Sequence, residues 1–200
     1  MSPTQTERGS EMVSRNPQQT ALVIIDVQNG ILAHLDGERG DAARRALDET
    51  VGRISGLLAR ARDAGLAVFH VQHNGPASHR LAVGSEGWRI RSELAPRPNE
   101  LLINKTACDS FFGTRLEEEL RARQIEHVVV AGCMTQYCID TTVRRAVSLG
   151  FDVTLAADGH ATGDAGSLRF EQIIAHHNAL LDGFDAGARE VLVRPCAALP

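Results

Sequence analysis

Cysteine is scarce in this sequence, and the few that occur do not form the usual structural patterns. There are four in 200 residues, and their spacings give neither a C-x-x-C pair nor a zinc-knuckle pattern. A chain of this length does not need disulfides to hold its core together. We therefore expect a reducing cytoplasmic setting, in which a reactive thiol can persist. The four are Cys108, Cys133, Cys138 and Cys196.

Long apolar runs and a one-sided charge are also missing. No run approaches the roughly 18–20 apolar residues that span a bilayer, and the N-terminal residues lack the pattern of a signal peptide. The net charge of −4 gives no electrostatic reason to expect nucleic acid or a membrane as partner. We expect residues 1–19 to be a flexible tail and residues 20–200 to form a single domain.

Segments with the pattern of strands and of helices alternate along the rest of the chain. This alternation predicts an α/β fold with three layers, α/β/α, around a mainly parallel, Rossmann-like sheet of about six strands. Gly65 is placed to end the first helix. The expected strands cover residues 22–26, 67–72, 101–104, 126–131, 151–156 and 190–193, and the expected helices cover 41–64, 113–123, 135–149 and 167–181.

Polar residues follow several of the predicted strands directly. Asp26 ends one expected strand, Lys105 directly follows another, and Cys138 comes shortly after the strand 126–131 and the turn at Gly132. In a parallel sheet the carboxyl ends of the strands meet at one edge, where ligands bind. We therefore expect these three side chains to lie close together.

Cys138 is placed where a thiol can act as a nucleophile. The start of a helix offers unpaired N–H groups and the positive end of the helix dipole, both of which favour a thiolate. Lys105 can add positive potential, and Asp26 can accept the thiol proton and return it to a leaving group. Taken singly, these residues would be read as a turn cap, a surface lysine and a small buried side chain. Together, in this order, they indicate a catalytic set.

Four motifs in this order resemble those of the isochorismatase-like cysteine hydrolase superfamily, which includes nicotinamidases and N-carbamoylsarcosine amidase. The resemblance covers about residues 20–193 and implies the catalytic triad Asp26, Lys105 and Cys138. The motifs are Asp26-Val27-Gln28, Asn104-Lys105, Ser110-Phe111-Phe112-Gly113-Thr114, and Gly132-x-x-Thr135-x-x-Cys138.

The same resemblance implies the remaining features of the site. A cis peptide is expected between Cys133 and Met134, which would aim the Met134 N–H beside the Cys138 N–H as an oxyanion hole. The implied reaction forms a thioester on Cys138 and needs no cofactor. A homo-oligomer, dimer or tetramer, is also implied. Isochorismatases proper cleave a vinyl ether and lack the nucleophilic cysteine, so Cys138 argues against that alternative.

The substrate pocket is expected to draw on the long segment 73–100, which has no regular periodicity. A strand-end histidine is usually a hydrogen-bonded pocket wall, so we expect no metal. Zinc bound by His70, His73 and His79 is an alternative, although the Asp-x-His pattern of metal-binding nicotinamidases is absent. The expected pocket residues are Gln28, His73, Trp88, Phe111 and Tyr137, with His160 at the margin.

These observations predict a hydrolase that cleaves a C–N bond of a small amide or carbamoyl compound. An alternative of another class is a noncatalytic ligand-binding or thiol-sensing protein on the same scaffold. Asp26 and Lys105 argue against it, because sensing alone does not need a proton shuttle. Substrate specificity is assigned to the segment 73–100, and no residue in the sequence identifies the substrate itself.

Overall fold

The computed structural model describes residues 16–200, so most of the predicted tail, residues 1–15, lies outside the described residues. Pro17–Gln19 forms a short 3-10 turn, and the Gln19 side chain donates to Glu126 across the chain. Within residues 16–200, no helix is both long and apolar enough to cross a membrane.

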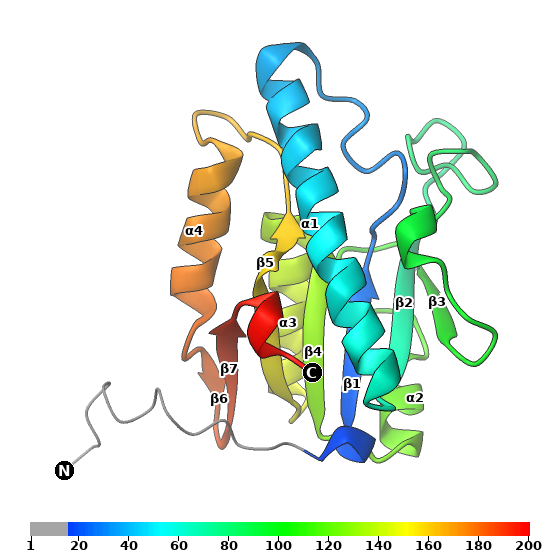
Figure 1. Ribbon diagram of the computed structural model, residues 1–200, viewed down its shortest axis with the longest axis vertical. Coiled ribbons are helices and arrows are strands. Elements are labelled where there is room, and N and C mark those ends of the chain that lie inside the picture. The colour runs from blue at the N-terminus through cyan, green and yellow to red at the C-terminus, as the bar shows by residue number, and fades with distance from the viewer. Residues whose placement is uncertain (1–15) are drawn as a thin grey trace.

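The centre of the molecule is a seven-stranded sheet with the order β3-β2-β1-β4-β5-β7-β6 (Figure 1). Strands β1 to β5 and β7 run parallel, which confirms the predicted fold class. The additional strand, β6, pairs antiparallel with β7 and has only two residues, too few to leave a pattern in the sequence. The strands are β1 Thr20–Ile25, β2 Ala67–His73, β3 Leu101–Lys105, β4 His127–Cys133, β5 Asp152–Ala161, β6 Asp185–Ala186 and β7 Arg189–Arg194.

The helices match the predicted ones in place but differ at their ends. The helices are α1 Gly37–Asp63, α2 Leu116–Ala122, α3 Asp140–Ser148 and α4 Phe170–Leu181. Helix α4 begins three residues later than expected, because the Phe170 N–H donates to Asp164 and the Gln172 side chain accepts from the Arg169 N–H. Gly65 follows the end of α1 with a φ of +74°, as expected of a residue in that position.

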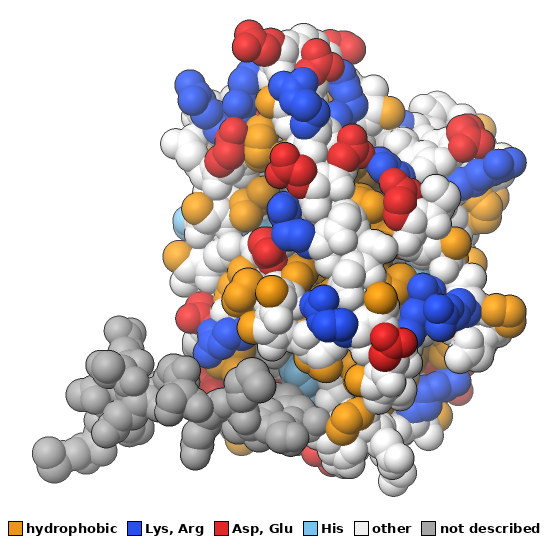
Figure 2. Space-filling view, in the orientation of Figure 1, with side chains coloured by type: hydrophobic (Ala, Val, Ile, Leu, Met, Phe, Trp, Pro, Cys, Tyr) orange, Lys and Arg blue, Asp and Glu red, His pale blue; other side chains and the backbone are white. Residues whose placement is uncertain are grey.

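The two faces of the sheet are covered by two separate apolar clusters. Helix α1 packs on one face through Leu47, Ile54 and Leu58, and helices α2 and α3 pack on the other through residues such as Leu120 and Val143. Figure 1 shows α1 in front of the sheet and α3 behind it. On the face drawn in Figure 2, acidic and basic side chains are interspersed over α1, so that face carries no large patch of one sign.

Candidate functional site

The three predicted catalytic residues lie at the carboxyl edge of the sheet. Asp26 directly follows β1, Lys105 is the last residue of β3, and Cys138 lies in the turn after β4. The sheet order reverses between β1 and β4, because β2 and β3 extend from β1 in one direction and β4 in the other. Such a switch point is where ligands bind in open α/β sheets. Asp26 has a φ of +53°, unusual for a residue with a side chain.

Lys105 contacts both of the other residues. Its Nζ lies 2.7 Å from Asp26 Oδ2 and 3.2 Å from Cys138 Sγ, and it donates to the Ala107 carbonyl at 2.8 Å. Asp26 and Lys105 are each about 2% exposed or less. The other Asp26 oxygen, Oδ1, is buried without a hydrogen-bond partner among the described residues. A thiol, an ammonium and a carboxylate therefore form one compact, largely water-excluded group.

Burial dominates the protonation behaviour of this group. Burial raises the pKa of Asp26 above its usual range, with the Lys105 charge acting against it. Burial alone would lower the pKa of Lys105, but Asp26 and Cys138 outweigh it and raise that pKa. Burial and the Asp26 charge also raise the pKa of the Cys138 thiol, with Lys105 opposing. The resting thiol is thus protonated, rather than the preformed thiolate that the helix-start argument favoured.

The turn that carries Cys138 differs from the predicted helix. Residues Thr135–Ile139 form a π-helical turn before α3 begins, and the N–H groups of Tyr137 and Ile139 both donate to the Met134 carbonyl. The peptide between Cys133 and Met134 is cis, as the resemblance implied. A wide turn of this kind is frequent at functional sites.

A buried chain of hydrogen bonds fixes the start of this turn. Thr135 Oγ1 lies 2.9 Å from His160 Nδ1, and His160 Nε2 lies 2.8 Å from Asn178 Oδ1. Asn178 donates through Nδ2 to the Ala157 carbonyl, so its Oδ1 must accept from His160. Burial lowers the pKa of His160 to about 4. The sequence placed His160 at the pocket margin; in the structure it is buried and supports the start of the turn that carries Cys138.

The motif 110–114 supports the same region from the other side. Ser110 is fully buried, and its N–H and hydroxyl both bond Thr142 Oγ1 on α3. Phe111 is 9% exposed and stacks on Phe151 within the apolar cluster. It therefore belongs mainly to the core, whereas its neighbour Phe112 is 69% exposed.

Gln28, another expected pocket residue, is turned inward. Its Nε2 donates to the carbonyls of His73 and Trp88, and its Oε1 accepts the His73 N–H. The side chain is fully buried, so these bonds take up its amide. The Trp88 carbonyl also accepts from Gln72. Gln28 thus ties the loop between β2 and β3 to β1 and leaves no polar atom for a substrate.

The other three expected pocket residues are at least partly accessible. The indole of Trp88 donates to Asn74 Oδ1, which fixes the ring within the loop. His73 is partly buried at the end of β2, with its ring 5.6 Å from that of His79. Tyr137 is 49% exposed, next to Cys138. These side chains can border a substrate.

The histidines considered as zinc ligands have separate surroundings. His70 is buried and pairs with Glu100 through a 3.0 Å contact, and Arg62 binds the same carboxylate. No group of three or more histidine, cysteine or acidic side chains suited to a metal occurs within residues 16–200. His70 therefore pairs with Glu100 and is not grouped with His73 and His79.

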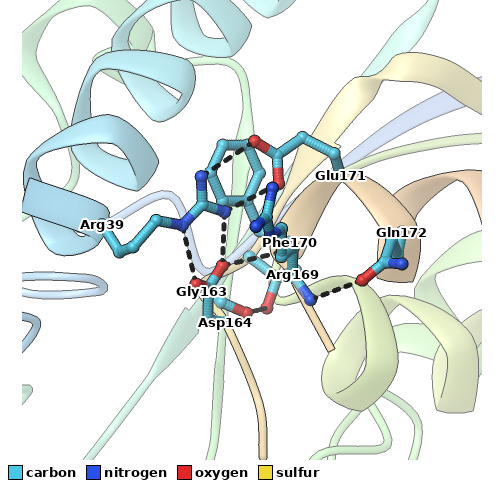
Figure 3. Close-up of polar contacts among 8 residues, drawn as sticks. Arg39, Gly163, Asp164, Arg169, Phe170, Glu171 and Gln172 are labelled. Atoms are coloured by element: carbon cyan, nitrogen blue, oxygen red, sulfur yellow. Dashed lines mark hydrogen bonds and ion pairs between the residues drawn. The ribbon is translucent and has the colours of Figure 1, made fainter. Parts of the chain in front are cut away.

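Two loops meet at the carboxyl edge and are held by Arg39. This residue, near the start of α1, contacts Asp164 in the loop before α4 and Glu171 in the first turn of α4, and it lies over the Phe170 ring (Figure 3). A Cβ on Gly163 would meet the Leu35 side chain at 2.5 Å, so the loop after β1 and the loop after β5 touch. A cavity of about 350 Å³ lies below, between α1 and α4, with His160 in its wall.

A residue that the sequence reasoning missed is Arg80, in the loop between β2 and β3. Its Nε donates to the Ile31 carbonyl at 3.0 Å, and its terminal nitrogen lies 3.8 Å from Met134 Sδ. Its side chain thus reaches the turn that carries Cys138. The only signal in the sequence was its position inside the loop already assigned to the pocket.

Comparisons with known proteins show which sequences and structures the chain is similar to. Residues 20–183 match the model of the isochorismatase domain family. A streptothricin hydrolase from Streptomyces noursei is 37% identical over 72% of this chain. The chain spans only 50% of the length of that relative. A ureidoacrylate amidohydrolase from Caulobacter segnis is 30% identical, with 78% of the chain and 77% of the relative covered. A crystal structure of an isochorismatase from Pseudomonas putida KT2440 superimposes with a TM-score of 0.81 at 28% identity, covering all of both chains.

Proposed function

Because the chain belongs to the isochorismatase family of hydrolases, we propose that it is a cysteine hydrolase that cleaves a C–N bond of a small amide or carbamoyl compound. The observation that carries this proposal is the placement of Lys105 Nζ against both Asp26 Oδ2 and Cys138 Sγ. Residues 20–200 would act as one catalytic domain. The names of two relatives support the reaction class: one hydrolyses streptothricin, and the other is an amidohydrolase of ureidoacrylate.

The first stage of the proposed reaction transfers the acyl group to sulfur. Because the resting thiol is protonated, Asp26 takes its proton as Sγ of Cys138 attacks the carbonyl carbon. The oxyanion that forms is stabilised by the N–H groups of Met134 and Cys138. Collapse of this intermediate breaks the C–N bond, and Asp26 returns the proton to the leaving nitrogen. The products of this stage are the thioester and a free amine or ammonia.

The second stage regenerates the enzyme. Asp26, now unprotonated, takes a proton from water, and the hydroxyl oxygen attacks the thioester carbon. The C–S bond breaks, the acid is released, and the proton on Asp26 passes to sulfur. Lys105 keeps its proton throughout, since its raised pKa holds the ammonium charged beside both partners.

Two expectations about the setting remain part of the proposal. All four cysteines are free thiols, with Cys108 exposed, which suits a reducing compartment such as the cytoplasm. A homo-oligomer is expected from the resemblance, and Tyr137 and Phe112 offer exposed apolar surface near the site.

A screen for ammonia or amine release across a panel of small amides and carbamoyl compounds tests the function. We expect at least one compound to be hydrolysed by the native protein and not by Cys138→Ala, while Cys108→Ala remains active as the matched control. Mass spectrometry of the native protein during turnover should show an acyl adduct on Cys138. No turnover and no adduct across the panel, with Cys138 only oxidised, would instead favour a thiol sensor.

A further inference from the structure

Arg80 is a half-buried cation without a carboxylate partner in the part of the chain that the structure describes. Its guanidinium bonds the Ile31 carbonyl and lies against Met134 Sδ. Other arginines of the protein, such as Arg39 and Arg62, bind carboxylates directly. A guanidinium removed from water is usually paired with an anion, because desolvation without pairing is unfavourable. The missing anion therefore needs an explanation.

The backbone around Arg80 is built to hold it in place. A Cβ on Gly87 would lie 2.3 Å from the Arg80 carbonyl oxygen, and one on Gly30 would lie 2.6 Å from it. The Gly30 N–H also donates to the Gly87 carbonyl. Only glycine allows this close approach. The loop between β2 and β3 is thus locked to the loop after β1 at the point where Arg80 leaves the backbone.

Through its contact with Met134 Sδ, Arg80 lies against the residue that begins the turn carrying the reacting sulfur. Burial lowers the pKa of Arg80, and a thiolate formed on Cys138 would act against this. Burial also lowers the pKa of His34 and of His73, and Arg80 contributes to both. Asp26, the carboxylate of the site, is already paired with Lys105. Asp36 also acts on His34, but no carboxylate within residues 16–200 forms an ion pair with Arg80.

We propose that Arg80 binds a carboxylate of the substrate, so that the compounds hydrolysed are amide or carbamoyl compounds that also carry an acid group. This inference rests on the function proposed above and narrows its substrate class. A guanidinium matches a carboxylate with two parallel hydrogen bonds, and this pairing also sets orientation. A substrate carboxylate bound by Arg80 would lie next to Met134. The length of the substrate between this carboxylate and the carbon that Cys138 attacks would then have to match the distance from Arg80 to Cys138.

Matched substrates test the preference directly. N-carbamoyl amino acids of increasing chain length are compared with their methyl esters, which lack the negative charge and carry one additional methyl group. For the native protein we expect kcat/KM to be about 10- to 100-fold higher for the best acid than for its ester, the range for a hydrogen bond to a charged group. Arg80→Gln should bring the acid-to-ester ratio of kcat/KM down to about one, and Arg80→Lys should keep part of the preference. Arg89→Gln, an exposed arginine of the same loop, is the control.

Alkylation of Cys138 tests the same subsite without hydrolysis. Iodoacetate and iodoacetamide transfer groups of similar size, but only iodoacetate is anionic. Peptide mapping gives, for each cysteine, the rate of alkylation by iodoacetate divided by the rate of alkylation by iodoacetamide. Arg80→Gln should lower this ratio at Cys138 by about 10-fold or more. At the exposed Cys108 the ratio should be unchanged. Unfolding temperatures of the variants show whether they remain folded.

The two experiments separate the possible failures. Hydrolysis of acid and ester at equal rates would overturn the Arg80 inference and leave the hydrolase intact. An Arg80-dependent alkylation ratio in a protein that hydrolyses no amide would keep the anion subsite and reject the proposed function. An alkylation ratio at Cys138 that is the same in native protein and Arg80→Gln overturns the subsite.

Discussion

Gly132 of β4 lies so close to Ile25 of β1 that a Cβ added to it would come within 2.0 Å of the Ile25 carbonyl oxygen. The φ of Gly132 is +129°, a conformation that side chains disfavour. The two residues are register partners at the switch point of the sheet, immediately before the cis peptide and the turn that carries Cys138. The close spacing of β1 and β4 at the site therefore requires a residue without a side chain at position 132.

Gly132→Ala should accordingly destabilise the protein strongly, by roughly 3 kcal/mol or more, since backbone must move on both strands. Urea unfolding followed by circular dichroism measures this. Gly52→Ala is the matched control, because Gly52 lies exposed in α1 with open space around its Cα. That variant should gain about 0.5–1 kcal/mol from helix propensity. Equal stability of the two variants would contradict the close approach.

Removing one member of the buried ion pair should damage stability and activity together. Asp26→Asn leaves the Lys105 ammonium buried without its counterion, which typically costs about 3–5 kcal/mol, and removes the proposed proton carrier, worth about 10²- to 10⁴-fold in rate. The double variant Asp26→Asn, Lys105→Met should recover part of the stability without recovering activity. A double-mutant cycle from urea unfolding and turnover measures the coupling. Additive effects on stability would mean that the pair does not interact as the 2.7 Å contact implies.

The pH profile of hydrolysis should reflect the buried environment of Asp26. Asp26 must be unprotonated to accept the thiol proton, so activity falls as acid protonates it. Burial raises the pKa of Asp26 above its ordinary value of 3.8. The acid limb of kcat/KM is therefore expected at a higher pH than for an exposed aspartate, on substrates that do not titrate in that range. A limb at or below pH 3.8 would contradict this assignment.

His160 should make stability depend on pH on the acid side of neutrality. Its pKa is lowered from 6.5 to about 4, so the unfolded chain binds a proton first as the pH falls. The contribution of His160 is present above pH 6.5 and is lost as the pH falls toward 4. The fall in pKa from 6.5 to about 4 corresponds to an upper limit of roughly 3 kcal/mol.

Urea unfolding at several pH values checks this for the native protein and for His160→Gln. The native protein should lose stability more steeply between pH 6.5 and 4 than the variant does. His176→Gln is the control, because His176 is exposed on α4 and should leave the slope unchanged. If His160→Gln and the native protein have the same slope, the buried neutral histidine is not the cause.

The sequence predicted the fold class and the meeting of Asp26, Lys105 and Cys138 because both depend on a simple rule. Strands that alternate with helices run parallel, and the residues that follow them then share one edge. This rule depends only on the order of elements along the chain. It carries no information about which way a side chain turns once it reaches the edge.

The residues that were misplaced or missed are those whose side chains are positioned by distant contacts. Gln28 turns inward because His73 and Trp88, 45 and 60 residues away, take up its amide. The Arg80 side chain is oriented by its hydrogen bond to the Ile31 carbonyl and by the close approach of Gly30 and Gly87 to its backbone. No periodic pattern in the sequence links these residues to Arg80. Phe111 was expected in the pocket, but its ring stacks on that of Phe151, the residue directly before β5.

The three contacts of Lys105 have a consequence for the timing of the reaction. An ammonium has three N–H donors, and here they face Asp26 Oδ2, Cys138 Sγ and the Ala107 carbonyl. The lysine is thus saturated, and Asp26 Oδ1 is the acceptor left over. A departing amine and an incoming water must use that one oxygen in turn. The protein would then operate by a ping-pong order, and a small competing nucleophile such as hydroxylamine could intercept the acyl group in place of water.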